Sequence, residues 1–142
     1  MDDARTHAYL VSLRASRIRL DYSRSRLEVL EANPALVPTP VFEPRGRSGY
    51  YRDRVQNDAL RNMACRELCR RTIRESYSEL RRFKGLLEES DLNDLARAVL
   101  WARYGMGLGW REVGKRLGMS TVHAYMMGRE SVEVIAGDLP RA

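Results

Sequence analysis

The sequence predicts an all-α protein in which two long helices, expected to pair as a coiled-coil-like antiparallel hairpin, precede a C-terminal domain of three shorter helices. Three observations support this class. Leucines recur every seven residues within residues 3–31, and a proline-free run extends from about 51 to 89. The last third holds short segments with helical apolar spacing and glycine breaks. A content of 44% hydrophobic and 31% charged residues in 142 positions is sufficient for a packed core.

The first long helix is expected within residues 1–32. Its heptad leucines are Leu13, Leu20 and Leu27, with Leu10 and Leu30 beside them, and this spacing is typical of a narrow coiled-coil seam. The stretch "NPALVPTPVFEPRGRSG", residues 33–49, carries four prolines and two glycines, which a continuing helix does not tolerate. Residues 33–50 are therefore predicted to be a partly extended linker.

The second long helix is predicted over residues 51–89. Apolar residues close to a three-four spacing form its narrow stripe: Val55, Ala59, Met63, Cys69, Ile73, Tyr77, Leu80 and Leu87. An antiparallel hairpin of the two long helices is the simplest account of these stripes. A dimeric coiled coil produces the same pattern, so both arrangements stay open.

Two features of the second helix have alternative interpretations. The arginines at 66, 70, 74 and 81 form a stripe that suits a phosphate backbone, but interleaved Glu67, Glu75 and Glu79 favour a solvated face. Cys65 and Cys69 share a helix face and have no nearby histidines for zinc, and their spacing fits a disulfide poorly. We interpret them as small buried groups and expect no metal.

A C-terminal domain is predicted over residues 90–137, followed by a tail at 138–142. Its first helix takes Ser90 or Asp91 as N-cap. One apolar side then holds Leu92, Leu95, Ala96, Val99 and Leu100. This helix is expected to end before "GMGLG", residues 105–109. The glycines there lack the spacing and the preceding strand of a phosphate-binding loop, which favours a flexible turn between helices.

The stretch "GWREVGKRLGMSTVHAYMMGRES", residues 109–131, predicts two short helices separated by a glycine turn. Trp110, Val113 and Leu117 give the first one an apolar face, and Gly114 permits close approach of its partner. Gly118 ends that helix in a left-handed conformation, Met119 fills the small core, and Ser120 caps the next helix through the amide of Val122 or His123. The inward face of the second helix is then Ala124, Met127, Ser131 and Ile135, and its outward positions are Thr121, Val122, Tyr125, Met126, Arg129 and Glu133.

This arrangement is a helix-turn-helix, which offers its second helix to the major groove of DNA. The stretch "RYGMGLGWREVGKRLGMSTVHAYMMGRESV" resembles region four of RNA-polymerase sigma factors, and more closely a family of small phage and prophage regulators built on that module. The resemblance covers roughly residues 91–135. It rests on Arg103, Tyr104, Gly107, Trp110, Val113, Leu117, Gly118, Ser120, His123, Tyr125, Arg129 and Glu130. Gly109, Gly114, Met126 and Gly128 depart from the family pattern.

The resemblance implies a transcriptional regulator that docks on promoter DNA. Thr121, Val122 and Met126 then face the bases, although the two apolar residues offer only contacts to thymine methyl groups. Phosphate contacts are expected from Arg111, Lys115, Arg116 and Arg129. His123 suits either a phosphate contact or a partly buried packing or capping role, and Trp110 and Tyr125 are interpreted as core. The complete candidate DNA-binding set is Arg111, Lys115, Arg116, Ser120, Thr121, Val122, His123, Tyr125, Met126 and Arg129.

The expected partners are double-stranded DNA, RNA polymerase and a homo-oligomer formed through the long helices. The formal net charge of +6 permits an anionic partner, but it is spread along the chain, since residues 110–142 hold five basic and four acidic groups. An alternative function is an interaction protein with a degenerate helix-turn-helix, either polymerase-binding or a phage DNA-packaging adaptor. No arrangement of nucleophile, base or metal ligands indicates an enzyme or a cofactor. Without an apolar run of membrane-spanning length or a signal pattern, we expect a cytoplasmic protein of a bacterial host cell.

Overall fold

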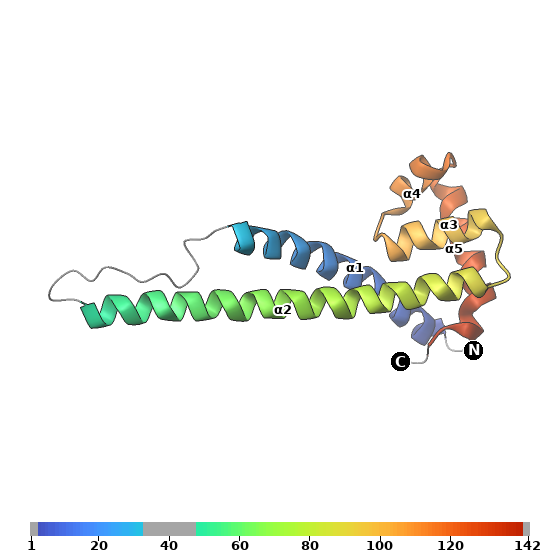
Figure 1. Cartoon of the computed structure of the whole chain (residues 1–142). Helices are drawn as coiled ribbons and strands as arrows, with labels where there is room; N and C mark the ends of the chain where they lie inside the picture. Colours follow the sequence, from blue (N-terminus) through green and yellow to red (C-terminus); the bar gives the residue numbers. More distant parts are fainter. Residues whose placement is uncertain (1–2, 33–47, 141–142) are drawn as a thin grey trace. The chain divides into compact units, whose positions relative to one another are not determined.

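The computed structural model describes residues 3–32 and 48–140, and within them every regular element is helical and no strand occurs. Two long helices, α1 (Asp3–Ala32) and α2 (Ser48–Glu89), are followed by α3 (Asp94–Leu100), α4 (Trp110–Leu117) and α5 (Thr121–Ile135), as coloured along the sequence in Figure 1. A π-helical turn, η2 (Trp101–Gly105), continues α3, and a 3₁₀ turn, η3 (Ala136–Asp138), follows α5. The all-α class is thus confirmed. Most of the predicted linker, residues 33–47, lies outside the described residues, and α2 begins at Ser48, earlier than expected.

The chain forms two compact units, one of Met1–Leu20 with Glu75–Ala142 and one of Asp21–Arg74. The second unit contains the C-terminal part of α1 and the N-terminal part of α2. A guanidinium nitrogen of Arg66 donates to the carbonyl of Leu30 at 2.9 Å, and Arg70 pairs with Glu31 at 3.1 Å. Cys69 is buried and Cys65 half-buried, and both are free thiols. The expectation that Cys69 packs as a small buried group is confirmed.

The buried stripe of α2 differs from the predicted one. Met63 and Tyr77, both expected in it, are 55% and 50% exposed. Asn62, Ser76 and Phe83 are buried instead. These three positions fall on a seven-residue spacing with Cys69, but two of them carry polar side chains, so an apolar pattern cannot reveal them. Neither amide atom of Asn62 has a hydrogen-bond partner among the described residues.

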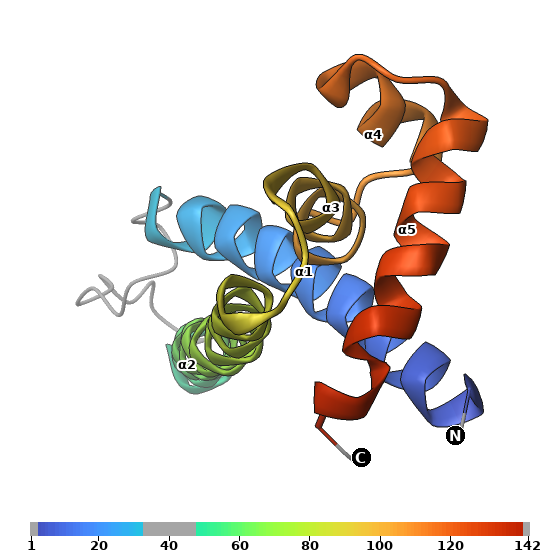
Figure 2. The same ribbon diagram turned by 90° about the vertical axis from the view of Figure 1, so that its right-hand side faces the viewer.

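In the first unit, the start of α1 and the end of α2 contribute large buried side chains. Leu13 and Leu20 of α1 and Phe83 of α2 are almost completely buried, as the leucine heptad of α1 predicts. Ser16 of α1 donates to a carboxylate oxygen of Glu79 in α2, so Glu79 is bonded within the unit. α5 packs against both α3 and α4, and Figure 2 shows these three helices around one another.

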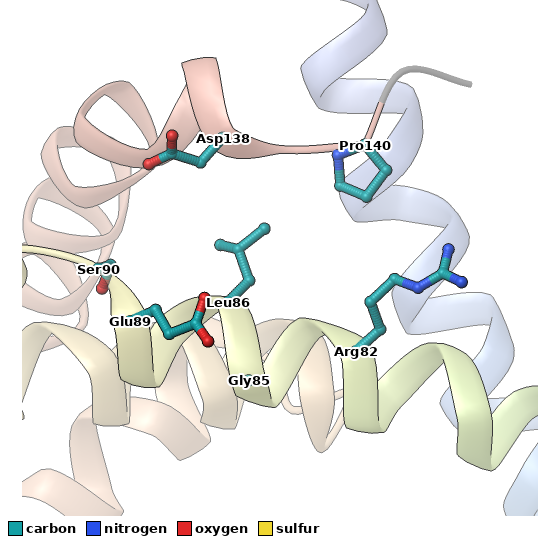
Figure 3. A pocket seen from close by; sticks show the side chains of 7 residues that line it. All are labelled: Arg82, Gly85, Leu86, Glu89, Ser90, Asp138 and Pro140. Atoms are coloured by element: carbon teal, nitrogen blue, oxygen red, sulfur yellow. The ribbon is translucent and has the colours of Figure 1, made fainter.

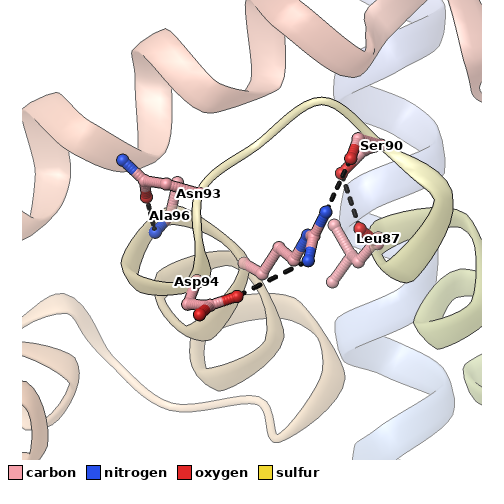
Figure 4. A network of polar contacts seen from close by, with 6 residues as sticks. Leu87, Ser90, Asn93, Asp94 and Ala96 are labelled. Carbon is pink, nitrogen blue, oxygen red and sulfur yellow. Dashed lines mark hydrogen bonds and ion pairs between the residues drawn. The ribbon is translucent and has the colours of Figure 1, made fainter.

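The link between α2 and α3 is a polar network (Figure 4). Asn93 is the N-cap of α3, since its side-chain oxygen accepts from the amide of Ala96 at 2.8 Å. Ser90, one of the two predicted caps, instead donates to the carbonyl of Leu87 at 2.6 Å. Arg97 donates to the carbonyl of Ser90 at 2.7 Å and pairs with Asp94 at 3.5 Å. The predicted cap at Ser90 or Asp91 is therefore wrong, and α3 begins later than expected.

The helix after Asn93 also differs from prediction at its end. It continues as a π-helical turn through Gly105, closed by the amide of Met106, which donates to the carbonyl of Trp101 at 2.8 Å. A β-carbon at position 105 would lie 2.2 Å from Cε3 of Trp101, so only glycine leaves room for this indole. The indole stacks on Phe83 at a centroid distance of 6.4 Å. Ala96, Val99 and Leu100 are buried as predicted, whereas Leu95 is 42% exposed.

Candidate nucleic-acid interface

The helix α4 is held close to the turn that follows it. Val113 is fully buried, and Gly114 beside it faces the backbone of the turn, where an added β-carbon would lie 2.7 Å from the carbonyl oxygen of Met119. Gly118 ends the helix with φ +69°, in the left-handed region, and the amide of Met119 donates to the carbonyl of Gly114 at 2.9 Å. The predicted roles of Gly114 and Gly118 are thus confirmed.

The helix α5 starts at a side-chain cap, as predicted. Oγ of Ser120 accepts from the amide of His123 at 3.1 Å. On the inward face, Ala124, Ser131 and Ile135 are buried, and Met127 packs at the edge of a core formed by Val99, Ala102, Val113 and Ala124. Met119 also packs against this core. The predicted inward residues of α5 are therefore its buried or partly buried ones.

Trp110 has a position that the sequence does not reveal. The tip of its indole lies over Gly128 of α5, where an added β-carbon would be 2.3 Å from Cη2. Its ring meets the edges of Tyr125 and Tyr104, with centroids 5.5 and 6.4 Å away. The guanidinium of Arg103 lies 4.8 Å from the ring centroid. Trp110 is thus a packing residue between α4 and α5, in agreement with its interpretation as core.

The turn between η2 and α4 is held by two arginines. Arg103 donates to the carbonyl of Leu108 at 3.1 Å, and Arg14 of α1 donates to that of Gly107 at 3.3 Å. Gly107 has φ +73°. Burial lowers the pKa of Arg103, with a further contribution from the nearby charge of Arg14. Arg103, which carries part of the family resemblance, therefore supports the scaffold and is not an outward contact.

All ten candidate DNA-binding residues have exposed side chains. On α5, Val122 is 71%, Met126 46% and Tyr125 43% exposed. Tyr125 was expected in the core, so this part of the interpretation is wrong: one edge contacts Trp110 and the rest of the side chain faces solvent. The side chain of His123 is exposed rather than partly buried, and only its backbone amide takes part in the cap.

Four exposed basic side chains accompany this surface: Arg111, Lys115 and Arg116 on α4 and Arg129 on α5. None of these four side chains makes a hydrogen bond or ion pair with any residue that the structure describes. Exposed cations that remain available in this way can neutralise phosphates. The same two helices also carry exposed Glu112, Glu130 and Glu133, so the surface is only slightly basic.

The arginine stripe of α2 makes contacts within the protein. Besides the bonds of Arg66 and Arg70, Arg74 approaches Glu67 at 3.7 Å and the guanidinium of Arg81 lies 5.4 Å from the ring centroid of Tyr77. Arg70, Arg74 and Arg81 are exposed, in agreement with the interpretation of the stripe as a charged, solvated face, whereas Arg66 is partly buried. These contacts do not indicate a second nucleic-acid surface on α2.

A cavity of about 610 Å³ lies between the end of α2 and the residues that follow α5 (Figure 3). Its charged lining combines Arg82 with the carboxylates of Glu89 and Asp138, so it does not select an anion. Within residues 3–32 and 48–140, no cluster of His, Cys, Asp and Glu has a composition that could hold a metal ion.

None of the helices in the described part of the chain has the length and apolar character needed to cross a membrane. Comparisons with protein-family models, with curated proteins and with solved structures found no match to this chain.

Proposed function

We propose that the protein is a DNA-binding transcriptional regulator of the phage and prophage kind that its sequence resembles, and that α4, the turn at Gly118 and α5 form its helix-turn-helix. The left-handed Gly118, the cap at Ser120 and the close approach at Gly114 support this assignment. In this proposal α3 is the supporting third helix, since it packs against both α4 and α5.

The observation that carries the proposal is the division of α5 into two faces. Ala124, Ser131 and Ile135 are buried, whereas Thr121, Val122 and Arg129 are exposed. A capped helix with a free outer stripe near its N-terminus is the element that helix-turn-helix proteins insert into the major groove. Exposed cations on α4 and α5 are then available for the flanking phosphates.

In this proposal, the exposed side chains of Thr121, Val122 and Met126, which we call the outer stripe, determine how DNA is recognised. Val122 and Met126 contact thymine methyl groups but donate no hydrogen bonds, and Thr121 adds one hydroxyl. Direct readout is therefore modest, and phosphate contacts from Arg111, Lys115, Arg116 and Arg129 supply most of the affinity. Such binding weakens steeply as the salt concentration rises.

For the long helices we propose the antiparallel hairpin, with a role in dimerisation or in contact with RNA polymerase. The bonds from Arg66 and Arg70 to the end of α1 support pairing of α1 with α2 in one unit. The bond between Ser16 and Glu79 supports the pairing of the same two helices in the other unit.

Fluorescence anisotropy tests the proposal. The full-length protein is titrated into labelled fragments from the DNA that surrounds its own gene, across a salt series. We expect one fragment to bind more tightly than the others, with a steep loss of affinity as salt increases. Equal weak binding to all fragments, or no binding, contradicts a sequence-reading regulator.

One observation favours a second function. On the outer face of α5, the apolar side chains of Val122 and Met126 are 71% and 46% exposed, and an apolar surface of this kind also suits a protein partner. The protein is then an interaction module, either polymerase-binding or a DNA-packaging adaptor. A ring-like higher oligomer in light scattering, together with absent DNA binding, favours the adaptor.

A further inference from the structure

A second, smaller cavity of about 230 Å³ lies between α1, α2 and η2, and all its lining residues belong to the unit of residues 1–20 and 75–142. The face of α2 that lines it has side chains at positions i, i+3, i+4 and i+7, the spacing of one helix face: Tyr77, Leu80, Arg81 and Lys84. None of the residues that line this cavity lies on α4 or α5. The cavity is therefore separate from the candidate nucleic-acid interface.

The inner part of this cavity is apolar. Leu20 of α1 and Leu80 of α2 line it and are only 1% and 4% exposed, so they form its floor. Two aromatic side chains line it as well: Tyr77 is exposed, and Trp101 of η2 is partly buried. A lining of leucines and aromatic rings favours a ligand with an apolar or aromatic body over a small hydrated ion.

The charged side chains that line this cavity are all basic. The guanidinium of Arg81 lies 5.4 Å from the ring centroid of Tyr77, and Nζ of Lys84 lies 5.8 Å from that of Trp101. These cation–π contacts hold both cations beside the cavity without neutralising them. Neither cation makes an ion pair with a residue that the structure describes.

Arg17 is the third basic side chain of the lining, but it already interacts with another part of the protein. The positive charge available to a ligand is therefore that of Arg81 and Lys84. No carboxylate from the described part of the chain lines this cavity, in contrast to the larger one, where Glu89 and Asp138 accompany Arg82. Two cations without a carboxylate beside them favour an anionic ligand.

We propose that this cavity binds a small organic anion with an aromatic body, of the class of the aromatic carboxylates. The aromatic body packs against Leu20, Leu80 and the aromatic side chains of the lining, and the carboxylate accepts hydrogen bonds from Arg81 and Lys84. The volume of about 230 Å³ is below the range of roughly 300–1,000 Å³ that is usual for sites of drug-sized ligands, so the ligand is compact.

Other classes of ligand use only part of this lining. A neutral aromatic molecule covers the leucines but leaves the two cations without an acceptor. Inorganic phosphate pairs with the cations but leaves the apolar floor exposed to water. A small cation is repelled by Arg81 and Lys84, and a DNA duplex is too wide to enter a cavity of this volume.

Isothermal titration calorimetry of the full-length protein with 2-naphthoate tests the proposal. We expect saturable binding at one site per chain. The amide 2-naphthamide has the same shape without the charge, and inorganic phosphate has charge without the aromatic body, so each should bind about tenfold more weakly or less. Absence of naphthoate binding at millimolar concentration overturns the proposal, and so does binding of either analogue that is as strong as that of naphthoate.

Substitution of the two cations tests their role in this site. Arg81→Ala with Lys84→Ala should lower the affinity for 2-naphthoate by about tenfold or more, because the carboxylate loses both donors. Both side chains are exposed, so the fold should persist, which far-ultraviolet circular dichroism checks.

The matched control is Arg71→Ala with Arg74→Ala, which removes the same charge from α2 at positions that do not line the cavity. The control should keep the wild-type affinity for 2-naphthoate. An unchanged affinity in the cavity variant overturns the proposal. An equal loss in both variants also overturns it, because the anion then responds only to the net charge of the protein.

The two tryptophans of the chain locate the bound ligand. In a ¹H–¹⁵N correlation spectrum the indole signal of Trp101 is identified by its absence from Trp101→Phe. Addition of 2-naphthoate should shift this signal and leave that of Trp110, on α4, in place. A ligand that shifts Trp110 and not Trp101, or shifts neither, lies elsewhere and overturns the proposal. These measurements contain no DNA, so their outcome is independent of the proposed regulatory function.

Discussion

Trp110 of α4 fills the space that a side chain at position 128 of α5 would occupy. A β-carbon added to Gly128 would lie 2.3 Å from Cη2 and 2.8 Å from Cζ3 of the indole. Tyr104, Tyr125 and the guanidinium of Arg103 also lie against the indole, which restricts its movement away from position 128. Gly128 therefore permits the close approach of α4 and α5.

We predict that Gly128→Ala destabilises the protein, although alanine favours a helix by about 1 kcal/mol over glycine. Overpacking against Trp110 should outweigh that gain, with a net loss of roughly 1–2 kcal/mol in the free energy of unfolding. Urea denaturation measures it. Gly85→Ala on α2 is the matched control, because nothing lies within 4 Å of its added β-carbon, and it should stabilise. Stabilisation by both substitutions contradicts the packing role of Gly128.

Two substitutions of the cap residue Ser120 distinguish its role in stability from a role in DNA binding. Ser120→Ala should lower the free energy of unfolding by about 1 kcal/mol, since the amide of His123 loses its acceptor. Ser120→Asp should keep the stability, because aspartate is an equally good N-cap. If this end of α5 meets phosphates, the aspartate variant should nevertheless bind DNA more weakly than wild type in anisotropy titrations. Unchanged affinity places Ser120 away from the nucleic acid.

Tyr104 gives the protein a pH dependence above neutrality. Burial raises the pKa of Tyr104 above its ordinary value of 10.0, an effect that outweighs the opposing charge of Arg103. The folded state therefore holds the phenol proton more tightly, so this stabilisation is complete below pH 10.0 and declines as the pH rises through the folded pKa. Urea denaturation at a series of alkaline pH values should show a shallower decline for Tyr104→Phe than for wild type. Identical slopes contradict the assignment.

The apolar residues of the outer stripe should affect specificity without affecting the fold. Val122→Ala with Met126→Ala removes exposed side chains, so the free energy of unfolding should change by no more than about 0.5 kcal/mol for each. Loss of thymine-methyl contacts should lower the ratio of specific to nonspecific affinity while the salt dependence stays the same. Competition titrations with unrelated DNA measure that ratio. An unchanged ratio means that these residues do not face bases.

The parts of the fold that were predictable depend on local chemistry. Gly118 and Ser120 mark the turn before α5 because a left-handed residue and a cap leave a recognisable pattern in the sequence. The cap of α3 was missed because Ser90, Asp91 and Asn93 are all suitable caps, and only the bonds of Ser90 to Leu87 and Arg97 decide between them.

The missed features depend on residues distant in the sequence. In the sequence, Gly128 only weakens a helix, and its role becomes clear from the contact with Trp110 in the structure. The role of Gly105 likewise depends on the π-helical turn, which places Trp101 beside it. The exposure of Met63 and Tyr77 has a different cause, since the polar side chains of their neighbours Asn62 and Ser76 occupy the buried positions of α2. An apolar pattern identifies a seam only where the seam residues are themselves apolar.

The most direct test of the central claim, that α4 and α5 bind DNA, is the salt dependence of binding by Lys115→Ala with Arg129→Ala. Each lost phosphate contact should reduce the slope of log affinity against log salt by about 0.9, so the double variant should lose roughly 1.8. The control Arg71→Ala with Arg74→Ala removes the same charge from α2 and should keep the wild-type slope. Equal slopes for wild type and both variants would contradict the claim that this surface holds the phosphate backbone.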